Sequence, residues 1–195
     1  MIPSDLLLAA YSSGWFPMAG DGGELSWYSP DPRGIIPLDR FHASSRLLRV
    51  VRRGTYRIAV DTAFEAVIRA CAESDRGPED AGTWISEEII QSYCALHRLG
   101  HAHSVEAWAD DRLVGGLYGV ALGAVFFGES MFHRATDASK VALVALIERL
   151  RTRGFGLLDT QWVTEHLRQF GAIEIPRAEY LRLLETNLQR DASFA

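Results

Sequence analysis

The sequence is poor in lysine and cysteine, and it has no long apolar run. Lys140 is the only lysine among the 20 Lys and Arg residues, a skew that we attribute to codon composition. Cys71 and Cys94 lie in helical patterns without the spacing of a redox or metal pair, which predicts buried thiols in a reducing compartment. The apolar run 6–11 is too short for a membrane span and follows no basic residue. We therefore expect a cytoplasmic protein with no signal peptide and no membrane segment.

Positive charge is also in short supply. The chain has 20 Lys and Arg residues against 25 Asp and Glu residues, which gives a net charge of −5. This balance argues against a surface that coats nucleic acid, although it allows a local basic patch. The 195 residues, of which 48% are hydrophobic, suffice for one good core with at most a small appendage.

The first half of the sequence predicts helices on either side of an aromatic segment. Ser4, Asp61 and Ser86 each precede helical apolar spacing and are expected to cap a helix. Residues 15–40 are rich in tryptophan, glycine and proline, and the prolines are expected to exclude regular secondary structure there. Residues 74–82 are polar and predict a loop.

The second half of the sequence predicts a sheet. Alternating and apolar runs indicate three consecutive strands over 104–132, followed by helix, strand, helix, strand and helix. An antiparallel meander that leads into a β-α-β crossover is the element order of an acetyltransferase-like (GNAT-type) domain. We therefore predict an α/β (α+β) fold, with a GNAT-like mixed sheet flanked by helices.

The run 156–161 reads as an apolar strand that ends in Asp159 and Gln161. Side chains two residues apart on a strand point to the same face, and polar groups beside apolar ones cost desolvation energy unless something uses them. Two interpretations are open. Either these residues cap the following helix, or Asp159 accepts a proton while Gln161 orients a nucleophile.

Glu129 is a second acid inside an apolar strand, with Phe127 and Met131 expected on its face. It either pairs with an arginine across the sheet, faces solvent on an edge strand, or grips a cationic group of a substrate. Acids on two strands suggest a single pocket in which polar chemistry takes place against an apolar wall.

Arg46, Arg49 and Arg53 fall on one face of a helix predicted from 44 to 53. Such a face is either solvated or, in a chain of negative net charge, the best local candidate for contacts with phosphate groups.

Two further patterns lack the context that their chemistry needs. His97, His101 and His103 span a helix stop at Gly100 and bring no second ligand cluster, so we predict no metal site. The run 151–156 matches the Arg-x-x-Gly-x-Gly loop with which acetyltransferases hold the pyrophosphate of coenzyme A. Here it follows a predicted helix and opens a strand, whereas such a loop must open a helix.

With these residues in view, the chain resembles the leucyl/phenylalanyl-tRNA–protein transferase family. The resemblance extends from Tyr11 to about Leu184 and rests on long motifs. They are Gly14-Trp15-Phe16-Pro17, Trp27-Tyr28-Ser29-Pro30-Asp31-Pro32-Arg33, Gly82-Thr83-Trp84-Ile85, Leu99-Gly100-His101-Ala102-His103-Ser104-Val105-Glu106, Val114-Gly115-Gly116-Leu117-Tyr118-Gly119, Phe127-Gly128-Glu129-Ser130-Met131-Phe132, Ala138-Ser139-Lys140 and Asp159-Thr160-Gln161.

The resemblance implies a reaction. A leucyl, phenylalanyl or methionyl group passes from aminoacyl-tRNA to the N-terminal amine of a protein that begins with Arg or Lys. The tagged protein is then degraded by the bacterial N-end rule pathway. The resemblance implies no metal, no coenzyme A and no other cofactor, and we expect a monomer.

The resemblance also assigns roles to residues. Asp159 and Gln161 handle the proton of the attacking amine and position the reactants, and it stays open whether Asp159 is a base or an electrostatic aid. Glu129 binds the cationic residue of the acceptor. Trp84 and Tyr93 lie near the terminal adenosine, where stacking is expected. The remaining substrate-binding positions are Ser130 and, for an apolar slot that discriminates side-chain shapes weakly, Leu117, Phe126, Met131, Leu143, Leu146 and Leu158.

The chain departs from the family pattern at its N-terminal end. Residues 1–38 are expected to form a small, trimmed N-terminal domain and residues 39–195 the GNAT-like catalytic domain. Met18 stands where the family has an aromatic residue, often tryptophan, which weakens stacking at the acceptor end. Two alternatives remain. A coenzyme A-dependent N-acetyltransferase is disfavoured by the misplaced glycine loop, and a non-catalytic tRNA- or peptide-binding module by the joint presence of both acids and the amide.

Overall fold

A computed structural model describes residues 1–20, 24–74 and 83–195. Over these residues the helices are α1 (Ser4–Ser12), α2 (Ser45–Arg52), α3 (Phe64–Ala72), α4 (Glu87–Arg98), α5 (Ala138–Thr152), α6 (Glu165–Arg168) and α7 (Arg177–Leu188). The strands are β1 (Phe16–Ala19), β2 (Leu25–Tyr28), β3 (Arg33–Ile36), β4 (Arg57–Val60), β5 (Ala102–Ala109), β6 (Arg112–Leu122), β7 (Val125–His133), β8 (Leu157–Gln161) and β9 (Ile173–Ile175).

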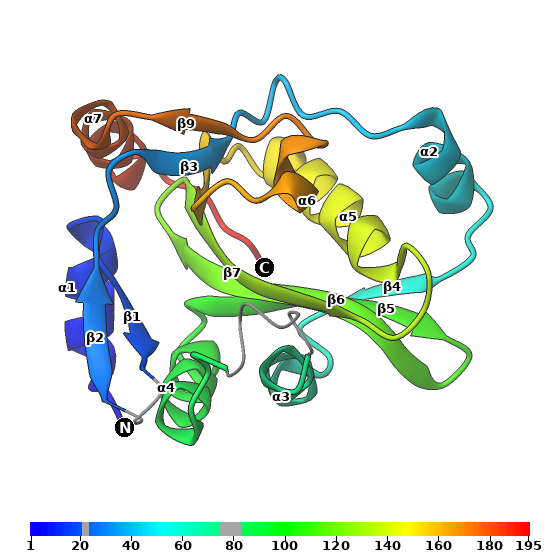
Figure 1. Cartoon of the computed structure of the whole chain (residues 1–195), viewed down its shortest axis with the longest axis horizontal. Coiled ribbons are helices and arrows are strands. Elements are labelled where there is room, and N and C mark those ends of the chain that lie inside the picture. The colour runs from blue at the N-terminus through cyan, green and yellow to red at the C-terminus, as the bar shows by residue number, and fades with distance from the viewer. Residues whose placement is uncertain (21–23, 75–82) are drawn as a thin grey trace.

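The described residues form one large sheet and one small one. The large sheet has seven strands in the order β4-β5-β6-β7-β8-β3-β9, and β1 and β2 form a separate pair. All neighbours in the large sheet run antiparallel except β7 and β8, which are parallel. Helices cover both faces of this sheet (Figure 1), so the predicted α/β fold with a mixed sheet flanked by helices is confirmed. Apart from Ser74, the loop predicted at 74–82 lies outside the described residues.

The expectation that residues 15–40 lack regular structure is wrong. In the small sheet Pro17 lies opposite Trp27, and a proline is tolerated there because each strand of a two-stranded sheet is an edge strand. β3 enters the large sheet between β8 and β9. The division into residues 1–38 and 39–195 stays a prediction, and β3, which precedes that boundary, belongs to the central sheet.

Of the three predicted helix caps, Ser86 is confirmed, because its side chain accepts a hydrogen bond from the backbone of α4. Ser4 is already the first residue of α1 and makes no cap. Asp61 caps nothing either. Its carboxylate binds β5 instead, accepting from the N–H of Ser104 at 2.8 Å and bonding Nδ1 of His103 at 2.7 Å.

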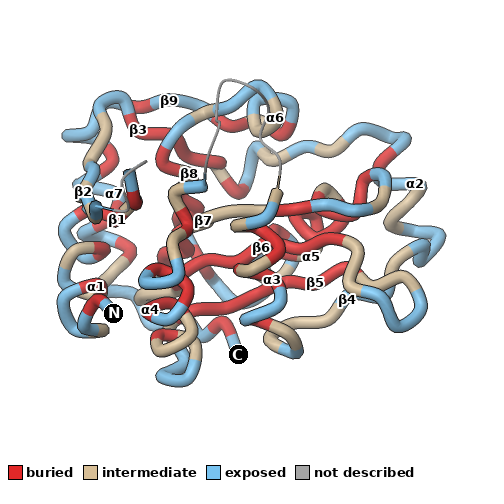
Figure 2. Tube along the Cα trace, turned by 60° about the horizontal axis from the view of Figure 1, so that its bottom comes forward, coloured by how far each residue is buried: buried red, intermediate tan, exposed pale blue. Residues whose placement is uncertain are grey.

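Two apolar clusters lie on opposite faces of the large sheet. The adjacent residues Phe126 and Phe127 of β7 belong to different clusters. The first cluster gathers the buried residues of α1, α3 and α4, including Cys71, and the second gathers those of α5. Much of the length of the central strands is buried (Figure 2). Among the described helices, none is both long and apolar enough to cross a membrane.

Candidate active site

The candidate site lies where the parallel strands β7 and β8 stop pairing. Phe127 pairs with Asp159, and the ladder ends there. The polar residues predicted from the sequence follow at once, Glu129 on β7 and Gln161 on β8. Nε2 of Gln161 lies 3.4 Å from Oε1 of Glu129, so the structure brings together the acids and the amide of both strands.

A β-bulge places Glu129 in the site. In the β6–β7 ladder the residues opposite Gly128 and Ser130 are neighbours in sequence, so Glu129 has no partner on β6. The extra residue interrupts the alternation of faces along β7. The expectation that Phe127 and Met131 share the face of Glu129 is therefore wrong for Met131. That side chain packs against the second cluster, whereas Phe127 is in the first.

The backbone makes a strained turn at Gln161. Its φ is 59°, in the left-handed region that residues with side chains rarely occupy. The N–H of Trp162 donates to the carbonyl of Thr160 at 2.6 Å, which closes a three-residue turn around Gln161. The partner strand β3 shifts register after Gly34, directly opposite. Strain of this kind persists only when the surrounding structure holds it, and it is common at functional sites.

Gly34 makes room for this turn, and Gly34→Ala is expected to destabilise the protein by about 1–3 kcal/mol, the usual cost of overpacking. A β-carbon on Gly34 would lie 2.6 Å from the carbonyl carbon of Trp162, and backbone atoms cannot move aside as a flexible side chain can. Gly20→Ala is the matched control, because among the described residues a β-carbon there would meet no atom closer than 3.7 Å. Thermal unfolding of both variants measures the difference, and equal effects would contradict a spacer role for Gly34.

Asp159 is fully buried and receives all of its described hydrogen bonds from the protein itself. Arg33 donates from Nε to Oδ1 at 2.9 Å and from an η nitrogen to Oδ2 at 2.6 Å. Tyr180 donates to Oδ2 at 2.7 Å, and the N–H of Gln161 donates to Oδ1 at 2.9 Å. The side chains of Arg33 and Asp159 are both 0% exposed. The carboxylate thus holds the Gln161 turn. It does not cap α6, whose cap is Thr164.

Sequence reasoning missed Arg33, Tyr11 and Tyr180 as residues of the site. The guanidinium of Arg33 lies 5.0 Å from the ring of Phe16 and 4.4 Å from that of Tyr180, and it donates to the carbonyl of Gly14 at 2.9 Å. An arginine at the start of the apolar strand β3 was the available signal, since a buried cation needs a buried acid. The two tyrosines look like ordinary apolar positions of α1 and α7 in the sequence.

Three side chains surround the carboxylate of Glu129. Tyr11 donates to Oε1 at 2.7 Å, and Tyr93 donates to Oε2 at 3.4 Å. The two tyrosine hydroxyls also hydrogen-bond each other. The third is the amide of Gln161. Desolvation is the main reason that the pKa of Glu129 is raised to about 8. The hydrogen bond from Tyr11 opposes this shift in pKa, and the negative charge of Asp159 adds to it.

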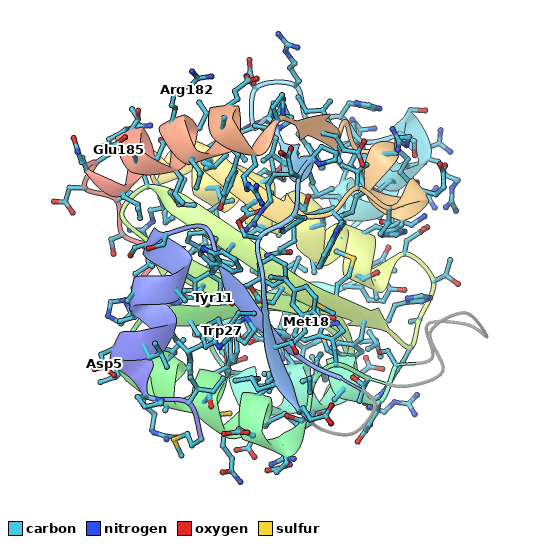
Figure 3. The ribbon with its side chains drawn as sticks, turned by 60° about the vertical axis from the view of Figure 1, so that its left-hand side comes forward. Asp5, Tyr11, Met18, Trp27, Arg182 and Glu185 are labelled. Carbon is cyan, nitrogen blue, oxygen red and sulfur yellow. The ribbon has the colours of Figure 1, made fainter. Side chains whose placement is uncertain are left out.

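The aromatic residues expected near the adenosine are occupied by packing. Tyr93 is 0% exposed, and its ring meets that of Tyr118 edge-on at 5.8 Å. Its hydroxyl hydrogen-bonds Glu129, and its predicted stacking on the adenosine stays a prediction. Trp84 and Met18 are half-buried and pack against the first cluster. Figure 3 shows Tyr11 pointing inward from α1, on the side of the helix opposite Asp5.

Two models of known families match the chain. The model described as leucyl/phenylalanyl-tRNA protein transferase matches residues 35–185, and the model of the N-terminal domain of the same enzyme matches residues 2–31. The chain belongs to the leucyl/phenylalanyl-tRNA protein transferase family. The family resemblance seen in the sequence is thereby confirmed, and the chain is a transferase.

Curated relatives that carry this family name match nearly the whole chain. The relative from Herpetosiphon aurantiacus is 58% identical over 190 residues, which is 97% of this chain and 96% of that protein. The relative from Gloeobacter violaceus is 56% identical over 191 residues, with coverage of 97% and 96%.

Two solved structures are distantly similar. The structure of L-PGS from Bacillus licheniformis has a TM-score of 0.48 and 11% identity, and the match covers 95% of this chain and 70% of that one. A GCN5-related N-acetyltransferase-like protein from Streptococcus suis has a TM-score of 0.42 and 13% identity, with coverage of 88% and 64%.

The apolar positions that the family resemblance assigns to a side-chain slot lie together. All six belong to the second cluster or pack against it: Leu117, Phe126, Met131, Leu143, Leu146 and Leu158. Met131 is half-buried, and the other five are at most 3% exposed. Phe126 pairs with Leu158 one position before the β7–β8 ladder ends, and both side chains lie on the face of the sheet opposite Phe127. Ser130, next to Glu129, is half-buried.

The three arginines of the predicted basic face are exposed on or beside α2. Arg46 pairs with Asp137 at 2.9 Å, and Nζ of Lys140 lies 3.8 Å from the same carboxylate. Together these side chains line a pocket of about 320 Å³, whose other lining residues are His42, Ser44, Leu47, Gln169 and Phe170. The pocket therefore carries two cations against one buried anion, next to the exposed Arg49 and Arg53.

Two of the three histidines make hydrogen bonds within the protein. Nδ1 of His97 bonds a backbone carbonyl at 2.7 Å, and Nδ1 of His103 bonds Asp61 at 2.7 Å. Residues 1–20, 24–74 and 83–195 contain no group of three or more side chains able to hold a metal ion. The run 151–156 joins the end of α5 to β8.

Proposed function

We propose that this protein transfers a leucyl or phenylalanyl group, and also a methionyl group, from aminoacyl-tRNA to the N-terminal amine of proteins that begin with Arg or Lys. The observation that supports this most is the contact of Glu129 with Gln161 where the β7–β8 ladder ends. A carboxylate suited to a cationic residue thus lies beside an amide suited to orienting an amine. The tagged proteins are then degraded by the N-end rule pathway.

The proposed reaction exchanges an ester for an amide. The aminoacyl ester is already activated, so the chemistry requires neither ATP nor another cofactor. The neutral N-terminal amine attacks the ester carbonyl carbon, a C–N bond forms, and the C–O bond to the terminal ribose breaks. The amine gives up a proton and the ribose oxygen gains one. The protein contributes by holding the amine and the ester in line and by excluding water.

In this mechanism Asp159 is a positioning residue and not the base. Both of its oxygens accept hydrogen bonds from within the protein, and its side chain has no exposed surface for an amine to reach. It acts on the substrate through the N–H of Gln161, whose amide then contacts the attacking nitrogen. Glu129 binds the cationic side chain of the acceptor, and Trp84 contacts the terminal adenosine. Tyr93, whose ring is fully buried, acts near it through its hydroxyl on Glu129.

The alternatives fit the structure less well. A coenzyme A-dependent N-acetyltransferase is disfavoured because the run 151–156 leads from a helix into a strand, so its N–H groups do not open a helix toward a pyrophosphate. A non-catalytic binding module is disfavoured by the joint presence of Glu129, Asp159 and Gln161 at one place in the sheet.

A transfer assay tests the proposal. Purified protein is mixed with an acceptor that begins with Arg and with radiolabelled leucyl-, phenylalanyl- or methionyl-tRNA, or with labelled acetyl-CoA. Label transferred from aminoacyl-tRNA supports the proposal, and label from acetyl-CoA supports the acetyltransferase. Binding of tRNA without any transfer supports the module. Acceptors that begin with Lys or, as a control, with Glu test the preference for a cation.

We further propose that Arg46, Arg49 and Arg53, with the pocket beside them, contact the tRNA phosphates. Arg49→Ala is expected to reduce the slope of log Kd against log salt concentration by about 1, because one fewer counterion is released. Arg98→Ala, at an exposed arginine of α4, is the control and should leave the slope as it is. Fluorescence anisotropy at several salt concentrations measures both slopes. An unaltered slope for Arg49→Ala would indicate that this helix face is solvated and makes no contact with phosphates.

We propose that a monomer is active. We place it in the cytoplasm, where aminoacyl-tRNA is made and used. Within the proposed division of the chain, residues 1–38 supply Tyr11 and Arg33 to a site built on residues 39–195.

A further inference from the structure

We infer that an exposed aromatic patch beside Gln161 binds the second residue of the acceptor protein, directly after its N-terminal Arg or Lys. This inference rests on the proposed function. The patch consists of Phe16, Tyr28 and Trp162. Trp162 is 43% exposed and Tyr28 is 38% exposed, and both contact the buried ring of Phe16. Single exposed apolar side chains are ordinary, but rings that adjoin one another at the surface often mark an interaction site.

The rings of the patch hold one another in place. Trp162 meets Phe16 edge-on with centroids 5.2 Å apart, Tyr28 stacks on Phe16 at 6.2 Å, and Tyr28 lies 6.4 Å from Trp162. Phe16 and Tyr28 are also directly opposite each other in the small sheet, and the guanidinium of Arg33 lies 5.0 Å from the Phe16 ring. An aromatic surface that is ordered in advance loses little conformational entropy when a ligand binds.

The patch adjoins the groups that we propose hold the first residue of the acceptor. Trp162 directly follows Gln161, whose amide lies 3.4 Å from Oε1 of Glu129. Phe16 belongs to the same apolar cluster as Tyr11, which donates to Glu129 at 2.7 Å. Consecutive residues of an extended peptide are only about 3.4 Å apart. With the first residue held by Glu129 and Gln161, the second residue therefore lies within reach of Trp162.

The charges around the patch favour a protein segment over RNA, although nucleobases also stack on exposed rings. A surface that binds RNA carries an excess of positive charge. Arg168, six residues after Trp162, pairs with Glu165 at 3.6 Å. The guanidinium of Arg177 donates to the carbonyl of Ser29, next to Tyr28, at 2.8 Å. Both arginines are thus engaged within the protein.

The acid Glu174 adds negative charge beside the patch. It is exposed on β9 opposite Gly34, the glycine against which the backbone of Trp162 packs. The arginines that we propose for the tRNA phosphates belong to α2, which lies on the opposite side of the molecule from β1 and β2 (Figures 1 and 2). An acceptor that begins with a cation suits this surface better than a phosphate backbone does.

The chemistry of the patch predicts which second residue it prefers. An apolar side chain laid over Trp162 and Tyr28 removes apolar area from water on both partners, and burial of this kind is favourable in proportion to the area. Serine covers little of the rings. Aspartate covers little as well, and Glu174 also repels it. We therefore expect acceptors with an aromatic or large aliphatic second residue to be used best.

The test is a competition between two acceptor peptides that begin with Arg-Phe and Arg-Ser and are otherwise identical, with phenylalanyl-tRNA as the donor. The ratio of their kcat/KM values does not depend on the fraction of folded enzyme. The wild type is expected to favour the Arg-Phe peptide about tenfold. Trp162→Ser is expected to reduce this ratio to about 2, and Tyr28→Ser should reduce it by less. A third peptide that begins with Arg-Asp should compete worst.

Trp15→Ser is the matched control, because Trp15 is similarly exposed, at 45%, and lies outside the patch, so the ratio should stay as it is. A ratio near 1 in the wild type, or an unchanged ratio in Trp162→Ser, overturns the inference. If Trp162→Ser instead weakens tRNA binding and leaves the ratio unchanged, the patch binds nucleobases. Should Trp162→Ser fail to fold, Tyr28→Ser carries the same test. Failure of the wild-type protein to transfer to any of the peptides would refute the proposed function itself.

Discussion

Asp159→Asn is expected to lower aminoacyl transfer about 100-fold while leaving the affinity for aminoacyl-tRNA nearly unchanged. Asparagine keeps an oxygen for the N–H of Gln161 but loses the charge that faces Arg33 across 2.6 Å. The buried guanidinium then faces a neutral partner, and the strained turn loses its rigid support. A displacement of about 1 Å in a reacting group is enough for a loss of this size. Single-turnover transfer and tRNA binding are the two measurements.

Stability and catalysis separate when both partners of the ion pair are changed. Asp159→Ala alone is expected to cost about 3–5 kcal/mol, because it leaves a buried charge unpaired. Arg33→Met combined with Asp159→Leu removes both charges and should restore most of that stability. Transfer should stay low in the double variant, since nothing then accepts the N–H of Gln161. A double variant that is both stable and active would show that Asp159 has only a structural role. Loss of tRNA binding in Asp159→Asn would show the same.

Glu106→Gln provides a matched control for these substitutions. Glu106 on β5 is also 0% exposed, and it accepts hydrogen bonds from Ser104 at 2.6 Å and from the hydroxyl of Thr62 at 2.8 Å. It lies outside the site. Its loss is expected to lower stability without a specific loss of transfer per folded molecule.

Short-range patterns predicted which residues meet in the site, but not how they are used. The apolar run before Asp159 and the alternation of strand faces indicated a buried acid beside Gln161, and both are buried. The partner of that acid is Arg33, which lies 126 residues away in sequence, so no local pattern could show that its carboxylate is already engaged. An acid without a known partner looks like a base, whereas the hydrogen bonds to Arg33 and Gln161 favour the positioning role that we propose for Asp159.

The other differences between the structure and the sequence-based predictions also arise from long-range pairing of strands. The bulge at Glu129 exists because β6 and β7 shift register, and the turn at Gln161 exists because Gly34 on β3 leaves space for it. Neither the shift nor the space is visible in the residues of β7 and β8 alone. The prediction that the prolines exclude strands from residues 15–40 was wrong for a related reason. A proline excludes a strand only where its missing N–H would face a partner, and edge position is a property of the whole sheet.

Glu129→Gln is expected to remove most of the pH dependence of acceptor binding. The pKa of Glu129 is raised to about 8, so at pH 7 most of the free protein carries this group protonated. The carboxylate forms as the pH rises through 8, and the KM for an acceptor with N-terminal Arg should fall about tenfold between pH 6.5 and 9. The variant should bind the acceptor weakly throughout. The N-terminal amine of the acceptor titrates in the same pH range whether the enzyme is wild type or Glu129→Gln. The difference in the pH dependence of KM between the two enzymes is therefore due to Glu129.

The same substitution is expected to stabilise the protein at high pH. In the unfolded chain a glutamate has a pKa of about 4.3, whereas the folded pKa of Glu129 is about 8. Between these values the folded state holds a proton that the unfolded state has released, so wild-type stability falls as the pH rises from about 4.5 to about 8. Glutamine has no such proton, so Tm of the variant should exceed that of the wild type by roughly 5 °C at pH 9 and by little at pH 4.5.

Glu185→Gln, at an exposed residue of α7 that Figure 3 labels, should show no such trend. A Tm for Glu129→Gln that drops below that of the wild type on going from pH 4.5 to pH 9 would contradict the raised pKa. If the trend holds, the reason for a cationic acceptor follows from it. Burial disfavours the ionised carboxylate, and in the proposed reaction an arginine or lysine side chain placed beside it removes that penalty. A neutral residue would leave the penalty in place, so under the proposed function the site favours an acceptor that brings a positive charge.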